Sequence, residues 1–312
     1  MTTEVVSAAA LAAAPSAPTS SLPATWTVLD VVRWTTARFV ERSVGTPRLD
    51  AELLVAHVLS LPRLQLYVQF ERVLTPEELA ALRGLIKRRQ GGESVAYLTE
   101  RKEFWKLEFA VDARVLVPRP DTETLVEEAQ ARLVPSAAPG EPGAAAPRIA
   151  DVGTGSGALA ITLAKLRTDA AVFASDLSAP ALEVARANAE RLAATVTFVE
   201  GDLAAPLAAH APFSLIVANL PYIPTAELAS LPPDVRTEPA LALDGGPDGL
   251  DLVRRLVADA PALLAPSGAL ALEIGDGQAE ATRALLQAAG FTDIQARRDL
   301  AGVERVVSGV KP

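Results

Sequence analysis

The carboxyl-terminal half of the sequence alternates between short apolar runs and helical stretches, and this alternation constrains the fold most strongly. The apolar runs RIADVG, AVFASD, VTFVEG and FSLIVAN occupy residues 148–153, 171–176, 196–201 and 213–219. Helical stretches separate the first three runs, and each run ends in a polar residue or a glycine. Such alternation is typical of a doubly wound, mostly parallel sheet, whose ligands bind at the carboxyl ends of the strands. The sequence therefore predicts an α/β domain with a site at that edge.

The end of the chain departs from this alternation. After GALALEIG at 268–275 comes a helical stretch, followed by FTDIQARRD at 291–299 and VERVVSGV at 303–310. Two strands thus follow each other with no helix between them. This ending is similar to the seven-stranded, Rossmann-like sheet of AdoMet-dependent methyltransferases, in which the last strand inserts antiparallel. We expect residues 122–312 to form this domain.

The amino-terminal part is predicted to be helical. Residues 27–40 and 49–60 carry apolar side chains at three- and four-residue spacings, and Thr75 to Glu78 has the pattern of a capping box. These patterns predict a small helical bundle over 23–92, preceded by a disordered tail over 1–22.

A hairpin is predicted between the two domains. Over 93–121, short alternating runs flank a polar stretch near Asp112, where the turn is expected. A helix over 121–133 then leads into PSAAPGEPGAAAP at 135–147, which has the composition of a flexible loop.

Composition excludes several kinds of site. The 312 residues include no cysteine and only two histidines, His57 and His210, so disulfides, thiol catalysis and a histidine-rich metal site lack material. We expect no bound metal. No run reaches the roughly 18 uncharged apolar residues of a membrane span, and no basic segment precedes the alanines of the amino terminus. These features predict a soluble protein of the cytoplasm. We also expect a monomer.

A glycine loop follows the first strand of the α/β domain. Its residues are Asp151, Val152, Gly153, Thr154, Gly155, Ser156 and Gly157. Glycines at these spacings permit a tight turn and a close approach of the backbone to a ligand. Gly153, Gly155 and Ala158 also satisfy the dinucleotide pattern G-x-G-x-x-G/A, so the loop alone allows either NAD or a methyl donor.

Acidic residues end the next two strands. Asp176 lies 25 positions after Asp151, close to where a carboxylate binds ribose hydroxyls. Asp202 and Leu203 follow the third strand. Because three consecutive strand ends meet at one edge, we expect a single pocket for a nucleoside ligand.

The fourth strand ends in Asn219, Leu220, Pro221 and Tyr222. This sequence resembles the (N/D)-P-P-(Y/F) motif of methyltransferases that modify planar nitrogen groups. A conjugated NH2 is a poor nucleophile, so the site must hold both N–H bonds and direct the nitrogen at the methyl group. The Asn219 carboxamide oxygen and a neighbouring main-chain carbonyl can accept these hydrogens, and Tyr222 can lie against the flat group.

Longer motifs make the resemblance specific. Over nearly all of residues 27–310 the chain resembles the release-factor glutamine methyltransferases. The matching segments are Leu49-Asp-Ala-Glu-Leu-Leu, Val95-Ala-Tyr-Leu, Glu103-Phe-Trp, Val117-Pro-Arg-Pro-Asp-Thr-Glu123, the glycine loop, Asn219-Leu-Pro-Tyr222, Glu238-Pro-Ala-Leu-Ala-Leu-Asp-Gly-Gly-Pro-Asp-Gly249 and Glu273-Ile-Gly-Asp-Gly-Gln278.

The resemblance implies transfer of a methyl group from S-adenosyl-L-methionine (AdoMet) to the glutamine side-chain nitrogen (N5) in the Gly-Gly-Gln motif of class 1 peptide chain release factors. It also implies that the helical domain helps to bind the factor. AdoMet would contact the glycine loop from Asp151 to Gly157, Asp176, Asp202, Leu203 and Asn219. The glutamine would contact Asn219 to Tyr222. Two residues depart from the family pattern: Leu220 replaces a usual proline, and Leu203 replaces a frequent aromatic residue.

Two alternatives remain open at this point. A DNA or RNA adenine N6-methyltransferase would use the same pocket and motif, but the net charge of −9 gives no basic surface, and no direct contact with nucleic acid is expected. The one short basic cluster, Lys87 to Arg89, lies in a stretch that also carries Glu77 and Glu78. A non-catalytic nucleotide-binding module would not need the cluster from Asn219 to Tyr222.

Overall fold

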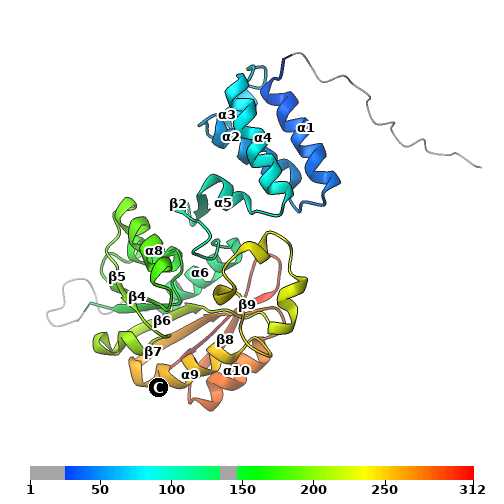
Figure 1. Cartoon of the computed structure of the whole chain (residues 1–312). Coiled ribbons are helices and arrows are strands. Elements are labelled where there is room, and N and C mark those ends of the chain that lie inside the picture. The colour runs from blue at the N-terminus through cyan, green and yellow to red at the C-terminus, as the bar shows by residue number, and fades with distance from the viewer. Residues whose placement is uncertain (1–24, 134–145) are drawn as a thin grey trace, which may run out of the picture. The chain divides into compact units, whose positions relative to one another are not determined.

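The computed structural model describes residues 25–133 and 146–312, which divide into two compact units at Arg83 and Gly84 (Figure 1). The predicted tail over 1–22 and most of the predicted loop over 135–147 lie outside the described residues.

The first unit is helical, as the apolar spacing predicts. It contains α1 (Val28–Glu41), α2 (Pro47–Val58), α3 (Gln65–Val68) and the beginning of α4 (Pro76–Gln90). The capping box predicted at Thr75 is confirmed: Thr75 N donates to Glu78 Oε2 at 2.9 Å, and Glu78 N donates to Thr75 Oγ1 at 3.2 Å. Phe39 and Leu54 are fully buried and belong to the core of this unit.

The second unit begins with the rest of α4, which a short helix and a hairpin follow. Helix α5 (Val95–Thr99) leads into β1 (Arg101–Phe104), which pairs antiparallel with β2 (Leu107–Ala110). The turn predicted near Asp112 is wrong: it lies at Trp105 and Lys106, whose φ angles are 48° and 60°. Two left-handed residues form the tight turn that matches strand twist, although neither is a glycine or an asparagine. Asp112 instead starts the following loop, where its carboxylate accepts from Arg114 N at 2.9 Å.

A seven-stranded sheet forms the centre of the second unit, with strand order β5-β4-β3-β6-β7-β9-β8. Strands β3 to β7 run parallel, and β9 pairs antiparallel with both β7 and β8, so the antiparallel insertion is confirmed. The bounds are β3 (Arg148–Val152), β4 (Ala171–Asp176), β5 (Thr197–Glu200), β6 (Phe213–Asn219), β7 (Leu264–Glu273), β8 (Thr292–Arg298) and β9 (Glu304–Val310).

Helices cover both faces of the sheet (Figure 1). They are α6 (Glu123–Arg132), α7 (Ala158–Leu166), α8 (Ala179–Arg191), α9 (Asp251–Leu263) and α10 (Ala279–Ala288). Short 3-10 helices are η1 (Pro120–Thr122), η2 (Ala205–His210), η3 (Thr225–Ser230), η4 (Val235–Thr237) and η5 (Ala240–Ala242).

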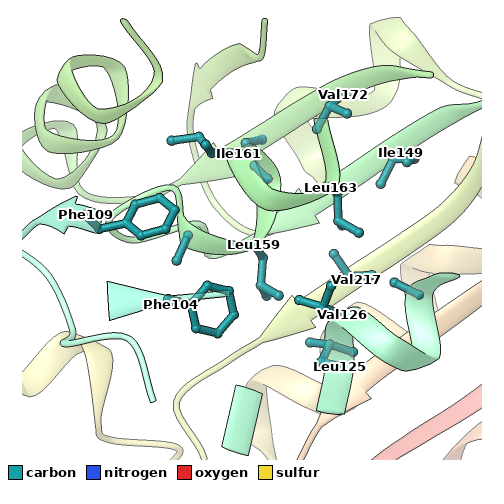
Figure 2. Packing of buried hydrophobic residues seen from close by; sticks show 14 of the residues in the cluster. Phe104, Phe109, Leu125, Val126, Ile149, Leu159, Ile161, Leu163, Val172 and Val217 are labelled. Atoms are coloured by element: carbon teal, nitrogen blue, oxygen red, sulfur yellow. The ribbon is translucent and has the colours of Figure 1, made fainter. Parts of the chain in front are cut away.

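Two apolar cores result, because successive strand residues point to opposite faces. Ile149 and Val217 belong to one core, with residues of α6 and α7 and with Phe104 and Phe109 of the hairpin (Figure 2). Ala150, Ile216 and residues of α9 and α10 form the other. The hairpin is therefore anchored in the core of the second unit.

None of the helices in the described parts combines the length and the apolar character that crossing a bilayer requires.

Candidate active site

The glycine loop connects β3 to α7, and Gly155 and Gly157 serve different purposes in it. Gly153, Gly155 and Gly157 have φ angles of 76°, 54° and 82°, which other residues rarely adopt. A Cβ at Gly157 would lie 2.9 Å from Ile161 Cδ1 and 3.2 Å from Ala185 Cβ, so this glycine permits close packing of the helices. A Cβ at Gly155 would meet no atom within 4 Å, so this part of the loop faces open space.

Asp151 stabilises the conformation of the glycine loop through hydrogen bonds from beneath it. Its side chain is fully buried, and its Oδ2 accepts from Thr154 Oγ1 at 2.7 Å and from Ala160 N at 3.1 Å. Among the described residues its Oδ1 has no hydrogen-bond partner. Burial raises the pKa of Asp151 to about 7, although the bond from Thr154 lowers it. Asp151 thus shapes the glycine loop and does not line the pocket.

Asp176 joins the glycine loop to the start of α8. Its Oδ2 accepts from Gly155 N at 2.8 Å, and its Oδ1 accepts from Ser178 N at 2.9 Å. Each oxygen retains a further lone pair, so the carboxylate can still accept from a ligand hydroxyl. Asp176 lines the pocket, at the strand end where the sequence predicts a ligand-facing carboxylate.

Asp202 and Leu203 follow β5 at the next strand end. The Leu203 carbonyl accepts from Ser175 Oγ at 2.7 Å, which ties this turn to β4. Asp202 forms an ion pair with Arg255 of α9. Both residues line the pocket together with Arg255.

These strand ends enclose one cavity of ≈ 190 Å³. Eight of the predicted site residues line it: Gly153, Gly155, Asp176, Asp202, Leu203, Asn219, Leu220 and Pro221. Asp151, Thr154, Ser156, Gly157 and Tyr222 do not. Sequence analysis missed further lining residues, including Arg114, Leu116, Pro239, Leu241, Leu252 and Arg255. For Pro239 and Leu241, the only sequence feature that pointed to the site was their place in the motif over 238–249.

Asn219 is the last residue of β6 and brings a carboxamide to the pocket. Its Nδ2 donates to Thr122 Oγ1 at 3.2 Å. The next residue, Leu220, is 3% exposed, and its Cδ2 would lie 3.2 Å from a Cβ built on Gly153. Leu220 therefore contacts the glycine loop.

Tyr222 points away from the pocket, toward the loop after β7. Its Cδ2 would lie 3.1 Å from a Cβ on Gly275, and its carbonyl accepts from Gln278 Nε2 at 2.9 Å. Burial and, to a smaller extent, the nearby Glu273 carboxyl raise the pKa of Tyr222 to about 12. The phenol is therefore neutral at physiological pH.

Two glycines of the segment 238–249 support the backbone of Pro221 and Tyr222. A Cβ on Gly245 would lie 2.6 Å from the Pro221 oxygen, and a Cβ on Gly249 would lie 2.1 Å from the Tyr222 oxygen. Gln278 bridges the two loops, because its Nε2 also donates to Asp248 O at 3.3 Å. These contacts explain why positions 245 and 249 of the segment are glycines.

A partly buried ion pair, between the buried Glu238 and the half-buried Arg119, fixes the segment 117–123. Glu238 accepts from Val117 N at 3.1 Å and from Arg119 Nη2 at 2.5 Å. Burial raises the pKa of Glu238, and the positive charge of Arg119 lowers it. The pair thereby holds η1, with Thr122, beside Asn219.

Comparison with known proteins agrees with this architecture. Residues 30–99 match the model of the PrmC N-terminal domain, and residues 149–235 match that of a methyltransferase domain. The release factor glutamine methyltransferase of Geobacter sulfurreducens is 45% identical over 92% of this chain and 98% of its own length. The enzyme of that name from Chlorobaculum tepidum is 44% identical over 91% of this chain and 97% of its own.

A solved structure shows the same fold at low sequence identity. The hMettl16 catalytic domain, in complex with MAT2A 3'UTR hairpin 1, aligns with a TM-score of 0.53 at 14% identity. The alignment covers 78% of this chain and 86% of that one.

Proposed function

The chain belongs to the family of release factor glutamine methyltransferases, and we propose that it methylates the side-chain nitrogen (N5) of the glutamine in the Gly-Gly-Gln motif of class 1 release factors. The single observation that carries this proposal is the Asn219 carboxamide, which lines the pocket with its nitrogen already engaged by Thr122.

AdoMet suits the residues of the cavity. Gly155 leaves open space for a ligand, and the Asp176 carboxylate has lone pairs for ribose hydroxyls. Leu203 and Leu177 offer apolar surface for a base. When bound, AdoMet supplies an electrophilic methyl group on a sulfonium. In transfer the C–S bond breaks, a C–N bond forms, and the amide nitrogen loses one proton.

The proposed role of Asn219 is to hold the substrate amide. Because Nδ2 is directed at Thr122, Oδ1 is the polar atom left for the pocket. An acceptor there would orient one substrate N–H, and the neighbouring main-chain carbonyl, that of Leu220, would orient the other. The nitrogen gains positive charge as it reacts, so an oxygen acceptor stabilises the transition state more than the bound substrate.

An assay with three substrates tests this function. The full chain is incubated with radiolabelled AdoMet and, separately, a release factor, duplex DNA and RNA. We expect label only in the release factor, and none in the same factor with its Gly-Gly-Gln glutamine replaced by glutamate. Label in DNA or RNA alone, recovered as N6-methyladenine, would instead establish an adenine methyltransferase.

Asp176→Ala is expected to weaken AdoMet binding by about 10- to 100-fold, because a hydrogen bond to a charged group contributes about 1.5–3 kcal/mol. Asp169→Ala is the matched control: this carboxylate lies in the turn before the same strand and pairs only with Arg167 among the described residues. Calorimetric titration measures both affinities. An unchanged affinity of the Asp176 variant would remove Asp176 from the binding site.

We further propose that the helical unit binds the release factor. Leu64, Tyr67 and Val68 in and beside α3 are 74%, 52% and 71% exposed, which is unusual for large apolar side chains on one short segment.

The double variant Leu64→Ser, Val68→Ser is expected to raise the KM for intact release factor about tenfold or more, with kcat unchanged. Leu300→Ser is the control, because this fully exposed leucine belongs to the other unit. Steady-state kinetics with wild-type KM for the double variant would place the docking surface elsewhere.

A further inference from the structure

Glu273 lies directly beside the candidate catalytic amide. It is the last residue of β7, and its Cα is the register partner of Asn219 at the end of β6. The residue is 2% exposed, and within the described parts of the chain its Oε2 has no hydrogen-bond partner. A buried carboxyl with an unpartnered oxygen destabilises the fold, so structure alone gives no reason for it.

The neighbours of Glu273 come from η1, β6 and β9, and they include Tyr222, whose pKa the carboxyl raises. Thr122 of η1 and Asn219 of β6 lower the pKa of the carboxyl, as does Arg305 of β9, while Asp121 raises it. Arg305, however, forms its own ion pairs with Asp299 at 3.1 Å and with Asp121 at 3.7 Å. The carboxyl is therefore only partly compensated, and burial raises its pKa to about 7.

We propose that Glu273 is a positioning residue for methyl transfer, which fixes and polarises the Asn219 carboxamide. This proposal rests on the proposed function. Asn219 Nδ2 donates to the Thr122 hydroxyl at 3.2 Å, and the Glu273 carboxyl lies at the register position beside Asn219, so both hold the NH2 group away from the substrate. An ionised carboxylate at Nδ2 also draws electron density onto Oδ1, because linked hydrogen bonds strengthen one another. Oδ1 then accepts the substrate N–H more strongly as the nitrogen becomes positive.

The charge state of Glu273 gives the inference a pH signature. The ionised form is the active form, so kcat should rise with pH through about 7. Stability should change in the opposite direction. Because the folded-state pKa lies above the ordinary glutamate value of 4.5, the contribution of Glu273 to stability is fully present below pH 4.5 and is lost as pH rises through about 7.

The test is Glu273→Gln in the full chain, which keeps size and an acceptor oxygen but removes the charge. Single-turnover methylation of release factor at saturating AdoMet should be about tenfold slower at about pH 8 and should lack the rise near pH 7. The thermal midpoint of this variant should equal or exceed that of wild type. A slower variant with a lowered midpoint and an unaltered pH profile would indicate a merely structural role and overturn the proposal.

Two controls isolate the effect. Asp151 also has a pKa of about 7, so Asp151→Asn at saturating AdoMet must retain the pH-dependent rise in kcat. In an Asn219→Ala background, Glu273→Gln should have no further effect, because Glu273 acts through Asn219. An additive loss in the double variant would contradict the inference.

If Glu273→Gln does not fold, Thr122→Val replaces it as the test. This variant should lower kcat and keep the pH-dependent rise, and a wild-type rate would overturn the proposal.

A measurement without release factor separates this inference from the proposed function. The side-chain NH2 resonances of Asn219, assigned by their loss in Asn219→Ala, should titrate near pH 7 in wild type and not in Glu273→Gln. Resonances that do not titrate in wild type overturn the inference. Failure of wild type to methylate release factor overturns the proposed function, whatever the resonances show.

Discussion

Asn219→Ala is expected to lower the methylation rate about 10²–10³-fold, the usual loss when one preorganised polar group at a reacting centre is removed. The substitution deletes Oδ1, the acceptor that matters most as the substrate nitrogen becomes positive. AdoMet affinity should change little, because the glycine loop and Asp176 remain in place. Single-turnover kinetics and calorimetric titration measure the two quantities.

Asn219→Asp is the informative comparison. It retains an acceptor oxygen of similar size but replaces the NH2 that faces Thr122 and Glu273, placing a second carboxyl beside a buried one. We therefore expect partial activity from Asp and almost none from Ala. An Ala variant with near-normal turnover would show that the amide-holding mechanism is wrong.

Gly249→Ala is expected to have the largest effect on stability, about 3–5 kcal/mol, with loss of activity. Gly249 has a φ of 78°, and its Cβ would lie 2.1 Å from the Tyr222 oxygen and 2.5 Å from Gln278 Nε2. Backbone strain and the clash add together, and relieving the clash moves Pro221 and Tyr222 away from the pocket.

Gly277→Ala separates strain from clash. Its φ is 79°, but a Cβ there meets no atom within 4 Å, so only the strain of about 1–2 kcal/mol remains. Urea unfolding of both variants gives the comparison. Equal losses of stability would mean that the segment 238–249 does not support the backbone at Tyr222.

The strand ends were predictable from sequence because their placement follows from a general rule. Parallel strands bring their carboxyl ends to one edge, so Gly153, Asp176, Asp202 and Asn219 had to meet there. The antiparallel insertion of β9 was implied by the resemblance to the methyltransferase sheet, which the two successive strand patterns suggested.

Other features depend on contacts that no local pattern contains. Trp105 and Lys106 form the hairpin turn although neither residue type favours a positive φ, so the turn was predicted too late in the chain. Asp151 and Tyr222 were predicted to contact ligands, but the structure directs both away from the cavity. Asp151 does not reach the cavity because it lies buried beneath the glycine loop, and Tyr222 does not because it packs against Gly275.

Glu273 shows the same limit at the site itself. A glutamate after an apolar run is the usual solvent-facing end of a strand, and only its register with Asn219 and its burial under η1 give it a possible role. The ion pair of Arg119 with Glu238, which holds η1 there, joins residues 119 positions apart. Sequence motifs marked these segments without showing what they contact.

Tandem mass spectrometry of a release factor after reaction with the full chain and AdoMet tests the central claim most directly. We predict one added methyl group, located on the side-chain nitrogen of the Gly-Gly-Gln glutamine, and none when Asn219→Ala replaces the wild-type enzyme for the same reaction time. A methyl group on any other residue, or an equal yield from the Asn219 variant, would contradict the account.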